Sequence, residues 1–157
     1  FEIETAPMRV KGRFLRRVTP PHGDLAVAPS LETLADVVPG AKPRRVTLGV
    51  WNNTGKPWRG EAMVIASAEA AKKERLDLSG SWTWLPDSAW VKLHRTQVDV
   101  GPKGSAELSL DLAVPDAKEN YGGAWEAIVL LRGSDGSVAF ARLRVRTAVA
   151  SPGSSGR

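Results

Sequence analysis

The sequence lacks cysteine altogether and holds only two histidines among its 157 residues. Without cysteine, the chain can form neither a disulfide framework nor a metal site built on thiolates. His22 and His94 lie far apart in the sequence and form no His-x-x-x-His pair, so a metal site of the usual spacing is excluded. No apolar run reaches the roughly 18 residues that span a bilayer, which predicts that the chain has no transmembrane segment.

Short functional signatures are almost absent as well. The chain contains no Gly-x-Ser-x-Gly elbow, no Walker loop and no dinucleotide-binding fingerprint. Its acidic residues are scattered, and no pair of carboxylates stands out as a general acid and base. One motif does match: Asn52-Asn53-Thr54 has the acceptor pattern for N-glycosylation. We therefore expect a non-catalytic protein that uses no cofactor.

The positive charge is concentrated at the two ends of the chain. Of a net charge of +5, residues 1–20 contribute +3 and residues 138–157 contribute +4, which leaves the intervening 117 residues at −2. A general polyanion-binding surface is therefore disfavoured. The aromatic residues do not alternate with the basic ones and no RNA- or DNA-binding motif is present, so we expect no nucleic-acid partner.

The 11 prolines and 15 glycines divide the sequence into short segments, which favours strands joined by turns over a helical bundle. Residues 106–114 alternate apolar and polar side chains, which predicts a strand with one buried face. Pro115 ends this strand, since proline cannot donate to a β ladder. Residues 124–131 are mostly apolar on both faces, which predicts a strand in the middle of the structure. The buried face of the first strand comprises Ala106, Leu108, Leu110, Leu112 and Val114.

The remaining segments complete an all-β pattern. Residues 29–40 are expected to form a loop. The segment from Ala68 to Arg75 is ambiguous: its composition favours a helical turn in isolation, but we favour a polar strand or connection. Seven or eight strands separated by turns indicate an immunoglobulin-like sandwich without a disulfide. The further strands are predicted over residues 24–28, 44–51, 61–67, 82–84, 90–93 and 139–149.

The sandwich is predicted to span residues 23–149, between an N-terminal arm or edge strand over residues 1–22 and a disordered tail over residues 150–157. The arm mixes basic and apolar side chains ahead of the break at Pro20-Pro21. It either pairs within its own subunit as an extra edge strand, or pairs with another subunit by strand addition. The residues expected to make that pairing are Arg9, Val10, Lys11, Phe14 and Leu15.

The six tryptophans are many for a chain of this length. If neighbouring indole rings are exposed, they could stack on sugar rings or anchor a protein partner. Alternatively, they cap the open end of the sandwich or pack against the arm. Trp125 belongs to the two-sided apolar strand, and we expect it in the core. The candidate contact residues are Trp58, Trp82, Trp84 and Trp90.

A ladder of arginines marks the last predicted strand. Arg142, Arg144 and Arg146 share one face of it, and Arg132 lies across the preceding hairpin. Such a ladder is either the solvated face of an outer strand, where charge discourages edge pairing, or a contact surface for an acidic polymer or partner.

Turn residues and apolar spacing form one layout over six segments: Val38-Pro39-Gly40, Val46 to Asn53, Trp90 to Leu93, Val98 to Gly104, Val114-Pro115 and Gly122 to Val129. This layout resembles a known group of domains. It resembles the extracytoplasmic immunoglobulin-like domains of prokaryotic surface proteins, including the WxL-interacting type. It is also similar, more loosely, to the amino-terminal domain of periplasmic pilus chaperones.

The resemblance implies a non-catalytic extracytoplasmic domain, in the periplasm or at the cell surface, whose leader is absent from this chain. It implies a structural or assembly role through contacts with a protein partner or with other copies of the chain. Two alternatives stay open: a carbohydrate or cell-wall binding module that uses the tryptophans, and a chaperone-like domain. Pilus chaperones anchor their partner with a basic pair between two domains, and Arg44-Arg45 is the nearest candidate pair here.

Overall fold

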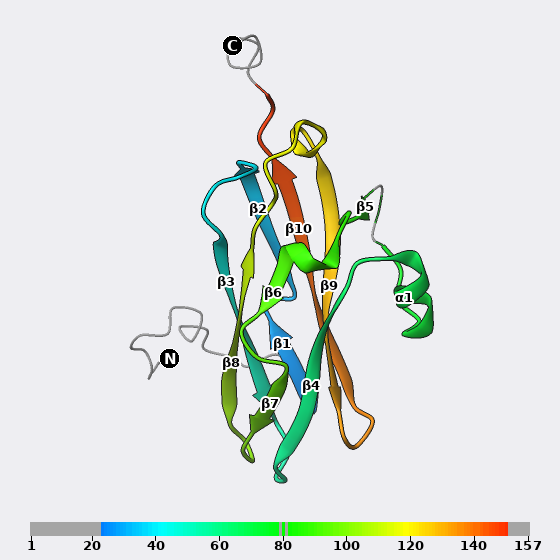
Figure 1. Cartoon of the computed structure of the whole chain (residues 1–157). Helices are drawn as coiled ribbons and strands as arrows, with labels where there is room; N and C mark the ends of the chain where they lie inside the picture. The colour runs from blue at the N-terminus through cyan, green and yellow to red at the C-terminus, as the bar shows by residue number, and fades with distance from the viewer. Residues whose placement is uncertain (1–22, 79, 81, 151–157) are drawn as a thin grey trace.

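The computed structural model describes residues 23–78, 80 and 82–150, which fold as two β-sheets packed face to face (Figure 1). The smaller sheet has the strand order β1-β3-β8-β6, and the larger has the order β2-β10-β9-β4-β7, with β5 also pairing with β9. The predicted all-β, immunoglobulin-like sandwich is thus confirmed. The smaller sheet consists of β1 (Leu25–Ala28), β3 (Arg44–Asn52), β8 (Ser105–Leu112) and β6 (Val91–Leu93). The larger sheet consists of β2 (Leu31–Val37), β10 (Val138–Thr147), β9 (Ala124–Gly133), β4 (Trp58–Ile65), β7 (Gln97–Val100) and β5 (Thr83–Trp84).

The structure differs from the prediction at β2, where the sequence suggested a loop. The chain leaves the smaller sheet after β1, which pairs with β3, and continues as β2, which runs parallel to β10. Leu34 and Val37 both belong to the core although they are three residues apart, because Asp36 adopts a left-handed φ of 55° and the register shifts there. This bulge breaks the period-two pattern. With β2 and the short strands, the described residues hold ten strands instead of seven or eight.

The predicted buried face of β8 is confirmed. Leu108, Leu110 and Leu112 are fully buried between the sheets, Val114 is buried just beyond the strand, and Ala106 is partly buried. Burying a leucine side chain contributes about 1.5–3 kcal/mol, so the three leucines are a large part of the folding free energy.

The central position of β9, between β10 and β4, agrees with its apolar residues on both faces. Its inward side chains join the main core, while Ile128 and Leu130 form a second cluster on the outer face of the sheet. Helix α1 (Ala68–Lys73) covers this second cluster, and Ala71 of the helix is 2% exposed. One face of β9 therefore packs on the other sheet and one on a helix.

The preference for a strand or connection over residues 68–75 is wrong, because this segment begins with α1. Ser67 caps the helix, and its Oγ accepts a hydrogen bond from the Ala70 N–H at 3.1 Å. Arg75 ends the turn in the left-handed conformation, with φ 59°. A helix of six residues is unstable alone. Packing against β9 and β4 therefore decides its conformation, and local propensity could not show that packing.

Asn52, the acceptor position of the glycosylation pattern, is 1% exposed at the end of β3. Its Nδ2 donates to the backbone carbonyls of Lys56, Val100 and Gly101, and its Oδ1 accepts from the Thr54 hydroxyl and N–H. The side chain thus ties the loop after β3 to the end of β7. The folded domain offers no glycosylation site at Asn52.

The arm over residues 1–22 and the end of the tail from residue 151 onward lie outside the described residues. The roles predicted for Arg9, Val10, Lys11, Phe14 and Leu15 therefore remain predictions.

Candidate interaction site

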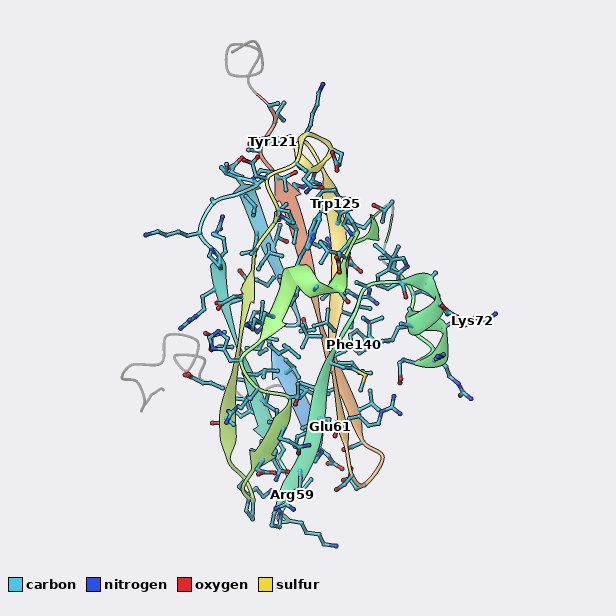
Figure 2. All side chains as sticks on the ribbon, in the orientation of Figure 1. Arg59, Glu61, Lys72, Tyr121, Trp125 and Phe140 are labelled. Atoms are coloured by element: carbon cyan, nitrogen blue, oxygen red, sulfur yellow. The ribbon has the colours of Figure 1, made fainter. Side chains whose placement is uncertain are left out.

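The outward side chains of β10 form a row on the outer face of the larger sheet, and Phe140 of this row is labelled in Figure 2. Val138 is 49% exposed and Phe140 is 36% exposed, whereas Arg142 and Arg144 are half-buried. Leu31, at the start of β2, lies beside Arg142 and is 44% exposed. We call these six residues the β10 face: Leu31, Val138, Phe140, Arg142, Arg144 and Arg146.

The backbone of β10 has an open edge over residues 138–141. β9 pairs with β10 along one side from Val138 to Arg146, but β2 covers the other side only from Arg142 onward. The Arg142 N–H donates to the Ser30 carbonyl on the β2 side at 2.8 Å. Backbone groups two residues apart point the same way in a strand, so those of Val138 and Phe140 also point toward that side. Within the described ranges, no strand pairs with them there, although β1 lies close to β10 while it pairs with β3 of the smaller sheet.

A buried ion-pair cluster lies under the β10 face. Glu126 of β9 is completely buried, and its carboxylate accepts hydrogen bonds from Arg142 Nη1 at 2.7 Å and from Arg144 Nε at 3.0 Å. Arg142 Nη1 also donates to the Asp77 carbonyl at 2.8 Å, which ties the segment after α1 to the sheet. Glu126 is a residue of this site that was not predicted from the sequence. A lone acidic residue in an apolar strand, near three alternating arginines, was the signal available.

Trp82 lies against the last two arginines of the row, Arg144 and Arg146. The guanidinium carbons of Arg144 and Arg146 are 4.8 and 4.6 Å from the centre of its ring. These distances are typical of cation–π contacts, to which arginine and tryptophan contribute most often. The ring is partly exposed and Arg146 is exposed, so this pair continues the β10 face to solvent.

The four predicted contact arginines do not form one free basic surface. Arg132 makes an ion pair with Glu74, which follows α1, and two of the other three bind Glu126. Arg146 alone among the four makes no ion pair with a carboxylate in the part of the chain that the structure describes. Three of these arginines therefore bind carboxylates of the domain itself, and Arg146 is the one left to contact a partner.

The four predicted contact tryptophans are also separated. Trp58 is 6% exposed, so it is no surface contact, and its Nε1 donates to Ser137 Oγ at 2.8 Å. Trp90 is partly buried and packs edge-on against Trp125, with ring centres 5.5 Å apart. Trp125, which was expected in the core, is partly buried and packs against the main core. Trp82 and Trp84 remain on the outer face of the larger sheet.

Trp84 belongs to an open cleft beside α1. The cleft has a volume of ≈ 630 Å³. Ala71, Leu76 and Trp84 of its apolar lining belong to the second cluster, and its polar lining comes from the helix and from the segment that follows it. The lining residues are Ala68, Ala71, Lys72, Arg75, Leu76, Asp77, Leu78 and Trp84.

Another charged group lies on the smaller sheet, away from the β10 face. Asp111 of β8 bonds to His94 Nε2 at 3.1 Å and to Arg45 Nε at 3.2 Å. The bond with His94, and then the bond with Arg45, hold the pKa of the Asp111 carboxyl below its ordinary value of 3.8. Arg45 of the candidate basic pair is thus engaged with Asp111, while Arg44 Nη1 donates to the Ala35 carbonyl.

The described residues include no group of three histidine, cysteine or acidic side chains placed to hold a metal ion. No helix among them is long and apolar enough to cross a membrane.

No protein-family model and no curated protein matches the sequence. Solved structures do match the fold. The chain is similar to the PapD-like domain 7 of human CEP192, with 12% identity and a TM-score of 0.54 over 92% of this chain and 100% of that domain. It is similar to a candidate carbohydrate-binding protein from Bacteroides ovatus, with 12% identity and a TM-score of 0.61 over 81% of this chain. The periplasmic chaperone SfaE matches with 15% identity and a TM-score of 0.51 over 84% of this chain.

The chain corresponds to 38% of the Bacteroides ovatus protein and 63% of SfaE. The fold is therefore an immunoglobulin-like sandwich that resembles PapD-like domains, in agreement with the looser of the two resemblances in the sequence. The WxL-interacting type remains a prediction.

Proposed function

We propose that this chain is a non-catalytic, extracytoplasmic assembly domain that binds a protein partner along β10. In this proposal, the partner adds a strand beside residues 138–141 and extends onto the rest of the β10 face. The open backbone edge next to the exposed Val138 and Phe140 is the observation that carries it.

An open edge of this kind offers both parts of a strand-addition site. Main-chain hydrogen bonds to the backbone groups of Val138 and Phe140 would supply affinity, and the side chains at alternating positions would supply specificity. Proteins usually protect such edges with charge or with a covering segment. On β10 the charged residues begin only at Arg142, where β2 already covers the edge.

The side chains of the β10 face define the chemistry of the partner. Phe140 and Leu31 favour apolar residues, and the exposed Arg146 beside Trp82 favours a carboxylate. Tryptophan and arginine are the residues most enriched at energetically important interface positions. The expected partner strand therefore carries apolar residues next to the open edge and acidic residues farther along.

The extracytoplasmic setting and the assembly role are supported by the fold alone. SfaE is a periplasmic chaperone that shares it. A chaperone-like role and a structural role in a surface assembly both require strand contacts with a protein, so the β10 face serves either one. A hydrolase screen tests the non-catalytic part of the proposal, which turnover abolished by a single Asp or Glu substitution would overturn.

Peptide display tests the location of the binding site. Random peptides are selected on the full chain, and amide hydrogen exchange then locates the bound peptide. We expect selected peptides to be extended and to protect the N–H groups of Val138 and Phe140. The variant Phe140→Ser should weaken their binding at least tenfold.

Val149→Ser is the matched control, because Val149 is 82% exposed just beyond the end of β10. It should leave peptide binding unchanged. Peptides that protect a different strand, or that bind Phe140→Ser as well as the parent, would contradict the proposed site.

A further inference from the structure

The cleft beside α1 is a second candidate site, separate from the open edge of β10. Its volume of ≈ 630 Å³ lies within the range of small-molecule sites, roughly 300–1,000 Å³. Lys72, Arg75 and Asp77 supply its charged groups, while Leu76 and Trp84 supply apolar surface. A cleft that combines one aromatic ring with a few polar groups is typical of a site for a small ligand.

The walls of the cleft are fixed to the sheet at two points. The Asp77 carbonyl accepts the bond from Arg142, which is itself held by the buried Glu126. On the other side, Glu74 makes an ion pair with Arg132. The segment between these two anchors carries Arg75 and Leu76, so the cleft is formed before any ligand arrives.

The two cationic side chains that line the cleft form no ion pair with a carboxylate of the described residues. Lys72 and Arg75 are exposed, and neither makes an ion pair with a carboxylate within residues 23–78, 80 and 82–150. This differs from Arg132, Arg142 and Arg144, which all bind carboxylates of the domain. The cleft therefore presents positive charge next to the ring of Trp84.

Arg75 occupies a backbone position that normally favours glycine. Its φ is 59°, and the N–H of Leu76 returns to the Ala71 carbonyl at 2.9 Å, which closes the helix in a Schellman-type turn. A side chain other than glycine or asparagine is disfavoured there. Arginine at this position, which lines the cleft, therefore makes the fold less stable than glycine at the same position would.

We infer that the cleft binds a sugar acid. The sugar's C–H face would stack on Trp84, as apolar faces of polar ligands do on aromatic rings. Its carboxylate would bind Lys72 and Arg75, and the Asp77 carboxylate would accept a bond from a hydroxyl. An apolar acid would satisfy the cations and Trp84 but would leave Asp77 next to hydrocarbon.

Titration of the full chain, followed by amide NMR shifts and tryptophan fluorescence, tests the inference with three probes: D-glucuronate, D-glucose and hexanoate. We expect D-glucuronate to shift residues of α1 and β5 in a saturable way. Glucose and hexanoate should each bind at least tenfold more weakly. Binding of glucose or hexanoate as tight as that of D-glucuronate, or no saturable shift with D-glucuronate, would overturn it.

Two variants separate binding from folding. Arg75→Gly should lower D-glucuronate affinity at least tenfold while the Tm stays equal to or above that of the parent, because glycine suits the left-handed position. Lys73→Gln is the matched control, since Lys73 neighbours Lys72 on the helix but does not line the cleft. Unchanged affinity in Arg75→Gly would overturn the inference, as would an equal loss in Lys73→Gln.

This inference does not rest on the β10 proposal. Phe140→Ser should leave D-glucuronate binding unchanged while it weakens peptide binding, and Arg75→Gly should do the reverse. The β10 proposal and the cleft inference can therefore be contradicted independently of each other.

Discussion

Glu126 organises the β10 face at the scale of a single residue. Its carboxylate is enclosed by the sheet, and two arginines that stand two residues apart on β10 bind it from the neighbouring strand. The sequence shows the acid and the arginines, but only the register of β9 and β10, which pairs Glu126 with Arg144, brings them together. Local patterns therefore identified the arginines as a surface ladder and could not identify their shared partner.

Removal of the Glu126 charge should destabilise the domain. The variant Glu126→Gln leaves two half-buried guanidinium groups without their counter-ion, and breaking a buried pair costs about 3–5 kcal/mol. Since both arginines retain some contact with solvent, we expect a loss of about 2–4 kcal/mol in the free energy of unfolding, measured by urea denaturation. The exposed Glu107→Gln is the control and should change it by less than about 0.5 kcal/mol. A loss in Glu126→Gln as small as in the control would show that the buried charge is dispensable.

Asp111 should make stability depend on acid pH. Its pKa is lower in the folded chain than its ordinary value of 3.8, so its bonds to His94 and Arg45 stabilise the fold above pH 3.8. This stabilisation is lost as the pH falls from 3.8 through the folded pKa. In Asp111→Asn, the Tm should therefore lie below that of the parent near pH 6 and approach it near pH 2, as measured by circular dichroism. A Tm difference that stays constant from pH 6 to pH 2 would contradict this linkage.

At the scale of the elements, the side chain of Trp58 links β4 to the hairpin that joins β9 and β10. Trp58 of β4 donates to Ser137 Oγ, and that hydroxyl donates to Asp135 Oδ1 at 2.6 Å inside the hairpin turn. From the sequence, Trp58 was a candidate contact residue, with capping of the sandwich or packing against the arm as the alternative. A glycine two residues later, on the same face of the strand, was the signal that the ring folds back over its own strand.

Alanine should be destabilising at two glycines next to the Trp58 ring, Gly60 of β4 and Gly133 at the end of β9. A Cβ at Gly60 would lie 2.3 Å from the Trp58 ring, and one at Gly133 would lie 2.4 Å from its Nε1. Each alanine substitution would displace the ring, and it would also crowd the Arg132 carbonyl at Gly60 and the Asp135 and Ser137 side chains at Gly133. We therefore expect a loss of about 1–3 kcal/mol in unfolding free energy, as in other overpacked sites. Gly55→Ala is the matched control, because a Cβ there meets nothing within 4 Å. Equal stability of all three variants in urea would contradict the role given to Trp58.

At the scale of the whole molecule, sequence patterns predicted the sandwich but not its assembly. Period two identified the inward face of β8, and apolar character on both faces placed β9 centrally. The bulge at Asp36 concealed β2, and α1 is too short to be recognised without its packing partners. The β10 face depends on the pairing of β10 with β2 and β9, and the cleft depends on a contact between Asp77 and Arg142, which lie 65 residues apart in the chain. The sequence could therefore supply candidate residues, such as Trp84 and Arg142, but not the contacts that bring distant segments together.

Deletion of residues 1–20 should decide how the arm contributes to assembly. The described core lies entirely within residues 23–150, so we expect the shortened chain to be a folded monomer by circular dichroism and light scattering. Strand addition between copies predicts that the full chain forms large, concentration-dependent species. A full chain that stays monomeric at high concentration, with its arm protected from proteolysis, would contradict pairing between copies.

The burial of Asn52 bears on how the protein can be produced. In a eukaryotic secretory pathway, the glycan is added to the nascent chain, when Asn52 is still accessible. A bulky sugar on that nitrogen would prevent the bonds to the Lys56, Val100 and Gly101 carbonyls, and the end of the sandwich could not close. Removing the motif through Thr54 would delete the hydroxyl that donates to Asn52 Oδ1. An expression host without N-glycosylation is therefore the appropriate source of the intact fold.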